Sequence, residues 1–299
     1  MIITNKQNLE PAIVRAVEQD EYSSGADVSI TGLTASPRIH WLKKRHADEI
    51  TVDVSDRIFA LMGRAIHHIL DKYNPEGTLT EHRLFADIAG WKVSGAPDVM
   101  TPEKIQDWKS TSVWTVIFDA NKEDYVLQLN GYRYLAMFNK LPIPAILENI
   151  LILRDWSMRK ASRDAGYPQH QVEKVQQKVM AIPQIKEFID GRVALFQGCD
   201  GKLDTDLPMC TAVERWYKGD KFAVMKKGRK TAIKVCDTLN DAELLVRQGY
   251  KGATHTEQRK TENVRCEHYC ECRMFCDYYN EVVAPAGAED VDGQGGGEE

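Results

Sequence analysis

The sequence contains no apolar run long enough to cross a lipid bilayer. Its longest apolar stretch, residues 141–153, is interrupted by Glu148, whereas a membrane-spanning helix needs about 20 consecutive apolar residues. The first residues of the chain also lack the basic segment and the apolar segment that together mark a secretory signal. We therefore expect a cytoplasmic protein with no membrane partner.

An excess of charge of one sign is also missing from most of the chain. The formal net charge is −5, and residues 284–299 hold five acids and no base, so the charges of residues 1–283 balance. The composition, 43% apolar and 28% charged, excludes collagen-like, coiled-coil and wholly disordered chains. A length of 299 residues without an internal repeat allows one large domain or two small ones.

Cysteine is absent from the first 198 residues, and seven cysteines follow. An odd number fits a complete disulfide framework poorly, and cytosolic thiols stay reduced. Four of the seven fall within residues 266–276, and clustered thiolates are typical ligands of Zn²⁺ or of an iron–sulfur cluster. The last third of the chain is therefore predicted to hold a metal centre.

Hydrophobic spacing predicts helices alternating with strands. The predicted helices cover residues 9–19, 36–44, 55–73, 124–138, 171–191 and 238–248, the fifth of them broken or kinked at Pro183. The predicted strands cover residues 81–88, 91–95, 97–100, 105–109 and 147–153, and residues 222–225 and 231–235 form a hairpin. This order predicts an α/β fold, with a central mixed β-sheet flanked by helices and a C-terminal cysteine-rich lobe that binds a metal cluster.

Composition along the chain predicts four segments. Residues 1–27 form a polar N-terminal segment, and residues 28–198 form the core. Residues 199–283 form the basic hairpin and the cysteine lobe, packed on the core. Residues 284–299, rich in glycine and acid, are predicted to be a disordered tail.

Two carboxylates and a lysine are predicted to converge on neighbouring strands. Asp107 and Lys109 are two residues apart on one strand and so face the same side of the sheet, and Asp98 comes from the strand before it. Two carboxylates that face one point bind Mg²⁺ or Mn²⁺ through oxygen. Such an ion lowers the pKa of a bound water and stabilises charge on a phosphate. Taken alone, an Asp-x-Lys pair is more typical of a solvated strand edge.

The pair does not stand alone, because four further motifs surround it. Gly63 precedes His67 by one helical turn, and Gln128 and Tyr132 share a helix face. The order of motifs is G-x-x-x-H (Gly63 to His67), a strand glutamate (Glu81), G-x-x-D (Gly95 to Asp98), D-x-K (Asp107 to Lys109) and Q-x-x-x-Y (Gln128 to Tyr132). Over residues 28–280 this order resembles the PD-(D/E)XK nuclease superfamily. It is most similar to the RecB-like branch, which includes phage exonucleases and CRISPR-associated exonucleases with an iron–sulfur cluster.

The resemblance implies a fold and a set of metal ligands. The fold would be the restriction-endonuclease-like core of the superfamily. His67, Asp98, Asp107 and the backbone carbonyl of Trp108 would bind catalytic Mg²⁺ or Mn²⁺. His68 competes for the histidine role, but the G-x-x-x-H spacing selects His67.

The resemblance also implies catalytic roles for residues that are not ligands. Lys109 would activate or orient the attacking water. Gln128 and Tyr132 would position the lysine and the DNA strand, and Glu81 matches an additional acidic residue.

For the cysteines, the resemblance implies a 4Fe–4S cluster held by one distant upstream cysteine and three near the C-terminus. The last two of those three would be separated by five residues, as Cys270 and Cys276 are, although the gap before Cys270 is one residue longer than usual. Cys272 is the alternate ligand, Cys199 is the second candidate for the upstream position, and a structural Zn²⁺ is the rival to iron. The expected ligands are Cys210, Cys266, Cys270 and Cys276.

Two groups of basic residues are candidates for DNA contacts. Residues 215–234 contain eight bases and one acid, and a second group follows the strand of residues 147–153, with Trp156 among its members. Phosphates attract lysine and arginine, and aromatic rings stack on unpaired bases, although a solvated charge run is as common for either group alone. The residues predicted to contact DNA are Arg154, Arg159, Lys160, Lys226, Lys227, Arg229 and Lys230.

These patterns together predict a metal-dependent DNA nuclease, an exonuclease that serves recombination, repair or phage DNA processing. Its partners would be DNA and a recombination or single-strand-binding protein, in the cytoplasm of a bacterium or of a phage-infected host. The alternatives are a DNA-binding or adaptor protein on a degenerate nuclease fold, and a zinc-stabilised structural protein.

Overall fold

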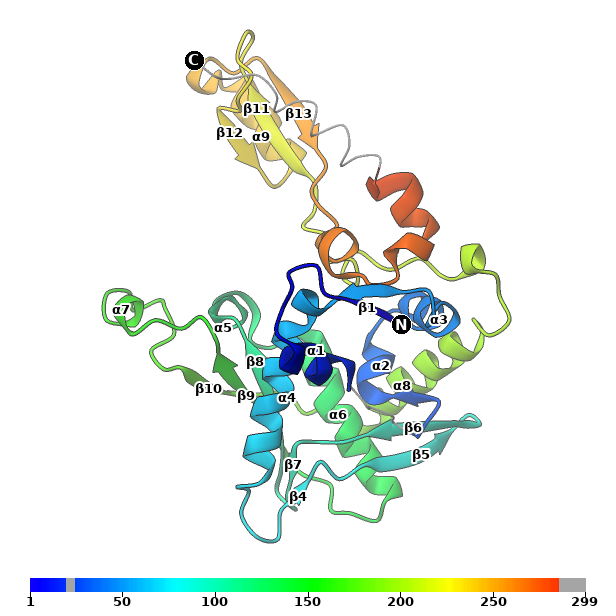
Figure 1. The fold of residues 1–299 in the computed structure, drawn as a ribbon. Helices are drawn as coiled ribbons and strands as arrows, with labels where there is room; N and C mark the ends of the chain where they lie inside the picture. The colour runs from blue at the N-terminus through cyan, green and yellow to red at the C-terminus, as the bar shows by residue number, and fades with distance from the viewer. Residues whose placement is uncertain (20–24, 285–299) are drawn as a thin grey trace. The chain divides into compact units, whose positions relative to one another are not determined.

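The computed structural model describes residues 1–19 and 25–284 (Figure 1). The chain forms two compact units. Among the described residues, the N-terminal unit contains residues 1–19, 25–40 and 47–202, and the C-terminal unit contains residues 41–46 and 203–284. From residue 285 on, the predicted acidic tail lies outside the described residues, as do residues 20–24 of the predicted N-terminal segment.

The N-terminal unit is built around a five-stranded sheet with the strand order β10-β9-β8-β7-β4. Its central pair, β8 and β9, is parallel, and the other three pairs are antiparallel, so the sheet is mixed. The strands are β4 (Leu79–Thr80), β7 (Val99–Met100), β8 (Lys104–Thr111), β9 (Ile146–Leu153) and β10 (Val172–Gln176). Helices α4 (Ile58–Asp71) and α6 (Glu123–Phe138) both pack against β8. The prediction of an α/β fold with helices flanking a mixed sheet is confirmed at this level.

Two smaller sheets complete the N-terminal unit. One has the order β2-β6-β5, formed by β2 (Val28–Ser29), β5 (Leu84–Ile88) and β6 (Trp91–Gly95). The other is a parallel pair of β1 (Ile2–Thr4) and β3 (Thr51–Asp53). The remaining helices of the unit are α1 (Pro11–Glu18), α2 (Ile30–Thr34), α5 (Val113–Asp119), α7 (Met158–Ala161) and α8 (Ile182–Gln197). Helix α3 (Pro37–Arg45) belongs to both units, since its last residues group with the C-terminal one.

The predicted helix of residues 171–191 is wrong in its first part, whereas residues 182–191 are helical as predicted. Its first part contains strand β10, the edge strand of the sheet, which pairs antiparallel with β9. Val172 and Val175 mimic helical spacing, but the backbone partners offered by β9 decide the outcome. Pro183 stands in the first turn of α8 instead of kinking a longer helix, because a proline has no N–H to lose there.

Three other predicted elements are shorter than expected. Asp53 accepts a hydrogen bond from the Ser55 backbone N–H and holds residues 54–57 in a 3₁₀ turn, so α4 begins at Ile58. Glu81 lies in the turn between β4 and β5, with a positive φ of 47°, and is therefore not a strand residue. Asp98 lies directly before β7 and not within it.

The C-terminal unit contains a three-stranded antiparallel sheet with the order β12-β11-β13. The predicted hairpin is confirmed as β11 (Lys221–Met225) and β12 (Lys234–Cys236), although β12 begins three residues later than expected. Strand β13 (His255–Arg259) was missed, and helix α9 (Leu239–Arg247) matches its prediction. Short helical turns follow at Arg265–Tyr269, Arg273–Phe275 and Tyr279–Val283.

Among the described residues, no helix has both the length and the apolar character needed to cross a membrane.

Candidate functional site

Side chains from two helices, two turns and one strand of the N-terminal unit meet around the middle of strand β8. His67 comes from α4, Glu81 from the turn between β4 and β5, and Asp98 from the turn before β7. Strand β8 contributes its central residues, and α6 contributes two residues one turn apart. The structure therefore gathers the residues that the motifs singled out, which are His67, Glu81, Asp98, Asp107, Trp108, Lys109, Gln128 and Tyr132.

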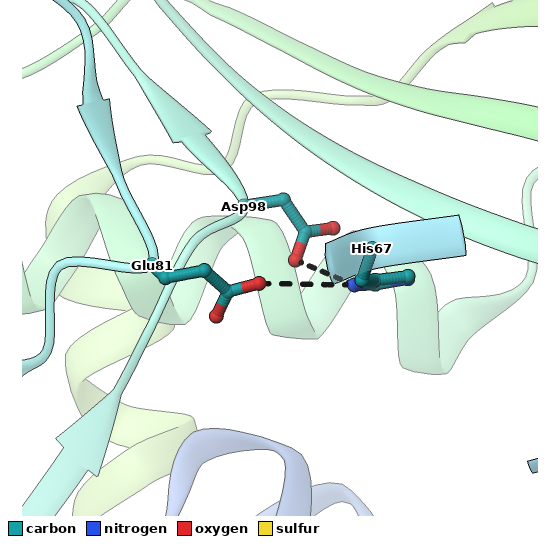
Figure 2. Close-up of side chains that lie close together, drawn as sticks. All are labelled: His67, Glu81 and Asp98. Carbon is teal, nitrogen blue, oxygen red and sulfur yellow. Dashed lines mark ion pairs between the residues drawn. The ribbon is translucent and has the colours of Figure 1, made fainter. Parts of the chain in front are cut away.

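His67 faces two carboxylates, as Figure 2 shows. Its Nδ1 lies 3.1 Å from Oδ1 of Asp98 and 3.8 Å from Oε1 of Glu81. The ligand atoms of the three residues all lie within 4.8 Å of one another. On the other side of the ring, Nε2 lies 3.1 Å from the carbonyl oxygen of Trp108. If Nε2 donates to that carbonyl, a neutral ring presents the lone pair of Nδ1 to the two carboxylates.

The charges of this trio act on one another. The hydrogen bond to Asp98 and then that to Glu81 raise the pKa of His67 to about 10, against the effect of burial. Burial raises the pKa of Asp98 above its usual value, while its hydrogen bond to His67 and the backbone N–H of Trp108 favour the charged form. That backbone N–H donates to Oδ2 of Asp98 over 2.5 Å. The imidazole of His67 therefore favours its protonated form when no metal ion is bound.

Asp107 is almost completely buried, and both of its carboxylate oxygens are bound. Oδ1 accepts a hydrogen bond from Nε2 of Gln128 at 3.0 Å. Oδ2 lies 2.7 Å from Nζ of Lys109 and accepts a second hydrogen bond from Nδ2 of Asn149 at 3.2 Å. The proximity of Asp107 also raises the pKa of Asp98, so the two carboxylates are electrostatic neighbours.

Lys109 is charged in this environment. Burial opposes its charge, but the charge and hydrogen bond of Asp107, together with the nearby Tyr132 and Asp98, hold the pKa of the ammonium above its usual range. The ammonium also lies 5.6 Å from the ring centre of Tyr125. A permanently charged lysine stabilises negative charge and orients ligands better than it accepts a proton.

Gln128 and Tyr132 share the inward face of α6, as their spacing predicts. Nε2 of Gln128 donates to the hydroxyl oxygen of Tyr132 at 2.6 Å as well as to Asp107. Burial raises the pKa of Tyr132, which keeps the phenol neutral. The ring of Tyr132 also accounts for the glycine at position 95, because a Cβ there would lie 2.7 Å from that ring.

The donor set is chemically suited to a hard divalent cation. Two carboxylates and an imidazole within 4.8 Å of one another, with a second buried carboxylate beside them, are the ligand types that Mg²⁺ and Mn²⁺ accept. His67 and Asp98 are held by backbone groups of Trp108, so one residue of β8 orients both. The residues present therefore fit the ion that the resemblance implies.

Asn149 is the site residue that sequence reasoning missed. It is fully buried on β9, directly opposite Asp107 in the parallel register. A polar residue among leucines at every second position of a strand is a signal that could have pointed to it.

The seven cysteines divide by burial. Cys199, Cys236 and Cys272 are buried, whereas the four predicted ligands Cys210, Cys266, Cys270 and Cys276 are half-buried. The thiol of Cys199 donates to the carbonyl of Leu195 in α8, inside the N-terminal unit. The thiols of Cys270 and Cys272 lie 3.6 Å apart.

The four half-buried thiols are close enough to influence one another. Burial first, and then the charges of Cys270, Cys210 and Cys276, raise the pKa of Cys266 to about 12. Within the described part of the chain, however, no three thiols gather as tightly as the ligand atoms around His67 do.

The residues predicted to contact DNA are placed in both units. In the N-terminal unit, Arg159 and Lys160 are exposed on α7, and the guanidinium of Arg154 lies 4.0 Å from the ring centre of Phe59. The indole of Trp156 is partly buried against the apolar cluster that contains Leu153 and Tyr167, and it donates to the carbonyl of Pro168. In the C-terminal unit, the exposed loop between β11 and β12 carries Lys226, Lys227, Arg229 and Lys230.

Exposed aromatic rings lie on α4, which carries His67, and on α5, which follows β8. Phe59 is 65% exposed on α4, two helical turns before His67. Trp114 and Phe118 are 53% and 76% exposed on α5, which follows β8, and their rings stack with centres 5.4 Å apart. The start of α5 is bound to the carboxylate of Asp155, the neighbour of Arg154, through Ser112 and the backbone of Val113.

Comparison with known proteins assigns no family to the chain. No family model matches it, and no curated protein matches it. Among solved structures, it is similar to one described as "Crystal structure of SSO0001", with 15% sequence identity and a TM-score of 0.44. That match covers 61% of this chain and 84% of that chain. A likeness at this level assigns no function.

Proposed function

We propose that the protein is a metal-dependent DNA nuclease, an exonuclease that hydrolyses phosphodiester bonds during recombination, repair or phage DNA processing. The observation that carries this proposal is the convergence of two buried carboxylates, Asp98 and Asp107, with His67 and the charged Lys109. Gathering four ionisable groups, two of them buried and two half-buried, costs free energy that a structural role does not explain.

His67, Asp98, Asp107 and the carbonyl of Trp108 would hold Mg²⁺ or Mn²⁺, with Glu81 beside them. The bound ion supplies a Lewis acid and a water of lowered pKa. The chain supplies the rest: the amide of Gln128 fixes the Asp107 carboxylate, and Tyr132 fixes the amide. The ammonium of Lys109 offsets negative charge that develops on the scissile phosphate and orients the attacking water.

We assign the N-terminal unit to the PD-(D/E)XK core, in its RecB-like form. Support comes from the elements on which the motif residues stand: a helix for His67, adjoining antiparallel strands for the segment from Asp98 to Lys109, and the helix between β8 and β9 for Gln128 and Tyr132. We also propose a cytoplasmic location, where a nuclease of this kind would meet DNA.

We propose that the C-terminal unit carries a 4Fe–4S cluster held by Cys210, Cys266, Cys270 and Cys276. Support comes from their shared half-burial and from the mutual effect of their charges. A structural Zn²⁺, which thiolates also bind, stays the alternative to iron. Cys272 is buried and stays the alternate ligand.

DNA is the proposed substrate, held by charge and by stacking. Arg154, Arg159 and Lys160 offer phosphate contacts on the N-terminal unit, and the lysines of the β11–β12 loop offer them on the C-terminal unit. The exposed rings of Phe59, Trp114 and Phe118 offer surfaces for unpaired bases. None of these groups distinguishes one base from another, so we expect little sequence specificity. A recombination or single-strand-binding protein is the proposed partner.

Digestion of single- and double-stranded DNA labelled at the 5′ or the 3′ end tests this proposal. With Mg²⁺ or Mn²⁺ the protein is expected to shorten labelled DNA from an end, and a chelator is expected to stop the reaction. Binding of DNA without any cleavage in either ion would favour the alternative, an adaptor on a degenerate nuclease fold.

A further inference from the structure

Asn149 interrupts a row of leucines on the buried side of β9. Leu147, Asn149, Leu151 and Leu153 alternate along the strand with more exposed residues, and all four are fully buried. A polar side chain in such a row costs free energy unless each of its polar atoms has a partner. Packing alone therefore does not explain why this position holds an asparagine.

The two ends of the Asn149 amide differ. Nδ2 donates to Oδ2 of Asp107, the residue opposite it in the register. Oδ1 is buried and has no hydrogen-bond partner within the described residues. A structural asparagine normally satisfies both ends, so the donor end accounts for the presence of this residue.

The bond to Asp107 completes the support of that carboxylate. Gln128 holds Oδ1 from the side of α6, and Asn149 holds Oδ2 from the side of β9. Lys109 shares Oδ2 but has a long, flexible side chain. The amide of Asn149 extends from a short side chain on an interior strand of the sheet, so it restricts the orientation of the Asp107 carboxylate more tightly than the lysine can. Because the amide is neutral, it does not cancel the negative charge of that carboxylate.

We propose that Asn149 is a positioning residue of the active site, which holds the carboxylate of Asp107 in the orientation that receives the divalent cation. This inference rests on the proposed function. Removing a hydrogen-bond partner of a metal ligand typically weakens metal affinity or activity by about 10–100-fold. At the same time, an apolar residue at this position removes the unpaired buried oxygen.

Asn149→Leu tests the inference, because leucine has the same branching and matches its neighbours in the row. Calorimetry of the metal-free protein with Mn²⁺ alone is expected to give a Kd about 10–100-fold weaker than that of the wild type. The melting temperature is expected to stay equal or to rise. On labelled DNA, kcat is expected to fall while KM stays unchanged. Asn149→Ala, which cannot overfill the site, is expected to give the same loss of Mn²⁺ affinity with a lower melting temperature.

Asn130→Leu is the matched control. Asn130 is as fully buried as Asn149, but both ends of its amide bind backbone: Nδ2 donates to Val126 and Lys178, and Oδ1 accepts from Met180. Its replacement is expected to lower the melting temperature and leave the Kd for Mn²⁺ unchanged.

The outcomes separate this inference from the proposed function. A wild type that binds no Mn²⁺ and cleaves no DNA overturns both. If the wild type binds Mn²⁺ and cleaves DNA, but an Asn149 variant has an unchanged Kd for Mn²⁺, this inference alone is overturned. An equal loss of Mn²⁺ affinity in Asn130→Leu also overturns it, because the effect would then follow from any buried amide.

Discussion

His67 shares its Nδ1 with two carboxylates, and this sets how strongly the imidazole holds a proton. The hydrogen bonds with Asp98 and Glu81 raise its pKa from 6.5 to about 10. The imidazole is therefore charged at neutral pH in the metal-free protein. Because the folded pKa is raised, this charge stabilises the metal-free fold in full below pH 6.5 and stops doing so as the pH rises through about 10.

A divalent cation must displace that proton, because a ligating imidazole is neutral. We expect Mn²⁺ binding at pH 7.5 to release about one proton and to strengthen by about tenfold for each unit of rising pH toward the pKa of His67. In His67→Gln, proton release is expected to fall close to zero and the affinity to weaken. Calorimetry in buffers of different ionisation enthalpy measures the number of protons. Equal proton release in the variant would show that His67 is not the ligand.

At the scale of elements, the packing of β6 against α6 controls the position of Tyr132. A Cβ added to Gly95 would lie 2.7 Å from that ring, so Gly95→Ala must push it away from Gln128 and, through Gln128, disturb Asp107. We expect kcat to fall by at least about tenfold and stability to fall by roughly 1–3 kcal/mol, as in overpacked cores. Kinetics on labelled DNA and thermal melting measure the two effects.

Gly63→Ala is the control for that prediction. Gly63 belongs to the neighbouring motif on α4, but its Cβ would meet open space. Alanine is favoured over glycine within helices by about 1 kcal/mol, so this variant is expected to keep its activity and to melt no lower than the wild type. A similar loss of kcat in both glycine variants would argue against the packing explanation.

The exposed rings on α4 and α5 are also an element-scale feature. Stacking of a base on an aromatic ring contributes about 1–3 kcal/mol, so Phe118→Ala is expected to weaken binding of single-stranded DNA by at least about fivefold. Fluorescence anisotropy with a labelled oligonucleotide in Ca²⁺ measures the Kd without cleavage. Phe138→Ala, an exposed ring at the last residue of α6, is expected to bind like the wild type. Equal affinity of the wild type, Phe118→Ala and Phe138→Ala for the oligonucleotide would show that the rings on α5 do not bind DNA.

The elements that could be predicted are those whose pattern is local. Strand β8 and helix α6 follow from spacing alone, and with them the shared face of Asp107 and Lys109 and that of Gln128 and Tyr132. Strand β10 was assigned to a helix because its pairing with β9 is a tertiary contact that its own residues do not encode.

Two site residues show the same limit. Glu81 was expected on a strand, but the backbone turns at this position with a positive φ, and the turn brings its carboxylate toward His67. Asn149 carries no motif, and its role depends on the register between β8 and β9, which the sequence does not specify. Local patterns thus identify the residues that share an element with a motif, and tertiary register supplies the others.

At the scale of the whole molecule, the two candidate metal centres belong to different compact units. The carboxylate site lies in the N-terminal unit, and the four half-buried cysteines lie in the C-terminal unit. The cysteines join a residue before the β11–β13 sheet to three residues after it, so a cluster there would close a long loop.

Serine replacements test that cluster. Cys210→Ser, like the changes at Cys266, Cys270 and Cys276, is expected to lose iron and to lower the melting temperature, because metal binding is coupled to folding. Cys272→Ser is expected to retain its iron. Iron analysis and thermal melting of the five variants, purified without oxygen, measure this. Full iron in Cys210→Ser together with iron loss in Cys272→Ser would instead place the ligands within residues 266–276.

The account depends most on Asp107, and one comparison tests it directly. The wild type, Asp107→Ala and a control, Asp87→Ala, are incubated with end-labelled DNA in Mg²⁺ or Mn²⁺; Asp87 is an exposed carboxylate on β5. Asp107→Ala is expected to bind DNA like the wild type, because Ile105 and Trp108 still pack β8. Its cleavage rate is expected to fall by more than about 100-fold, beyond the effect of losing an outer partner of a ligand, while Asp87→Ala stays active. Cleavage by Asp107→Ala at the wild-type rate would contradict the assignment of the active site.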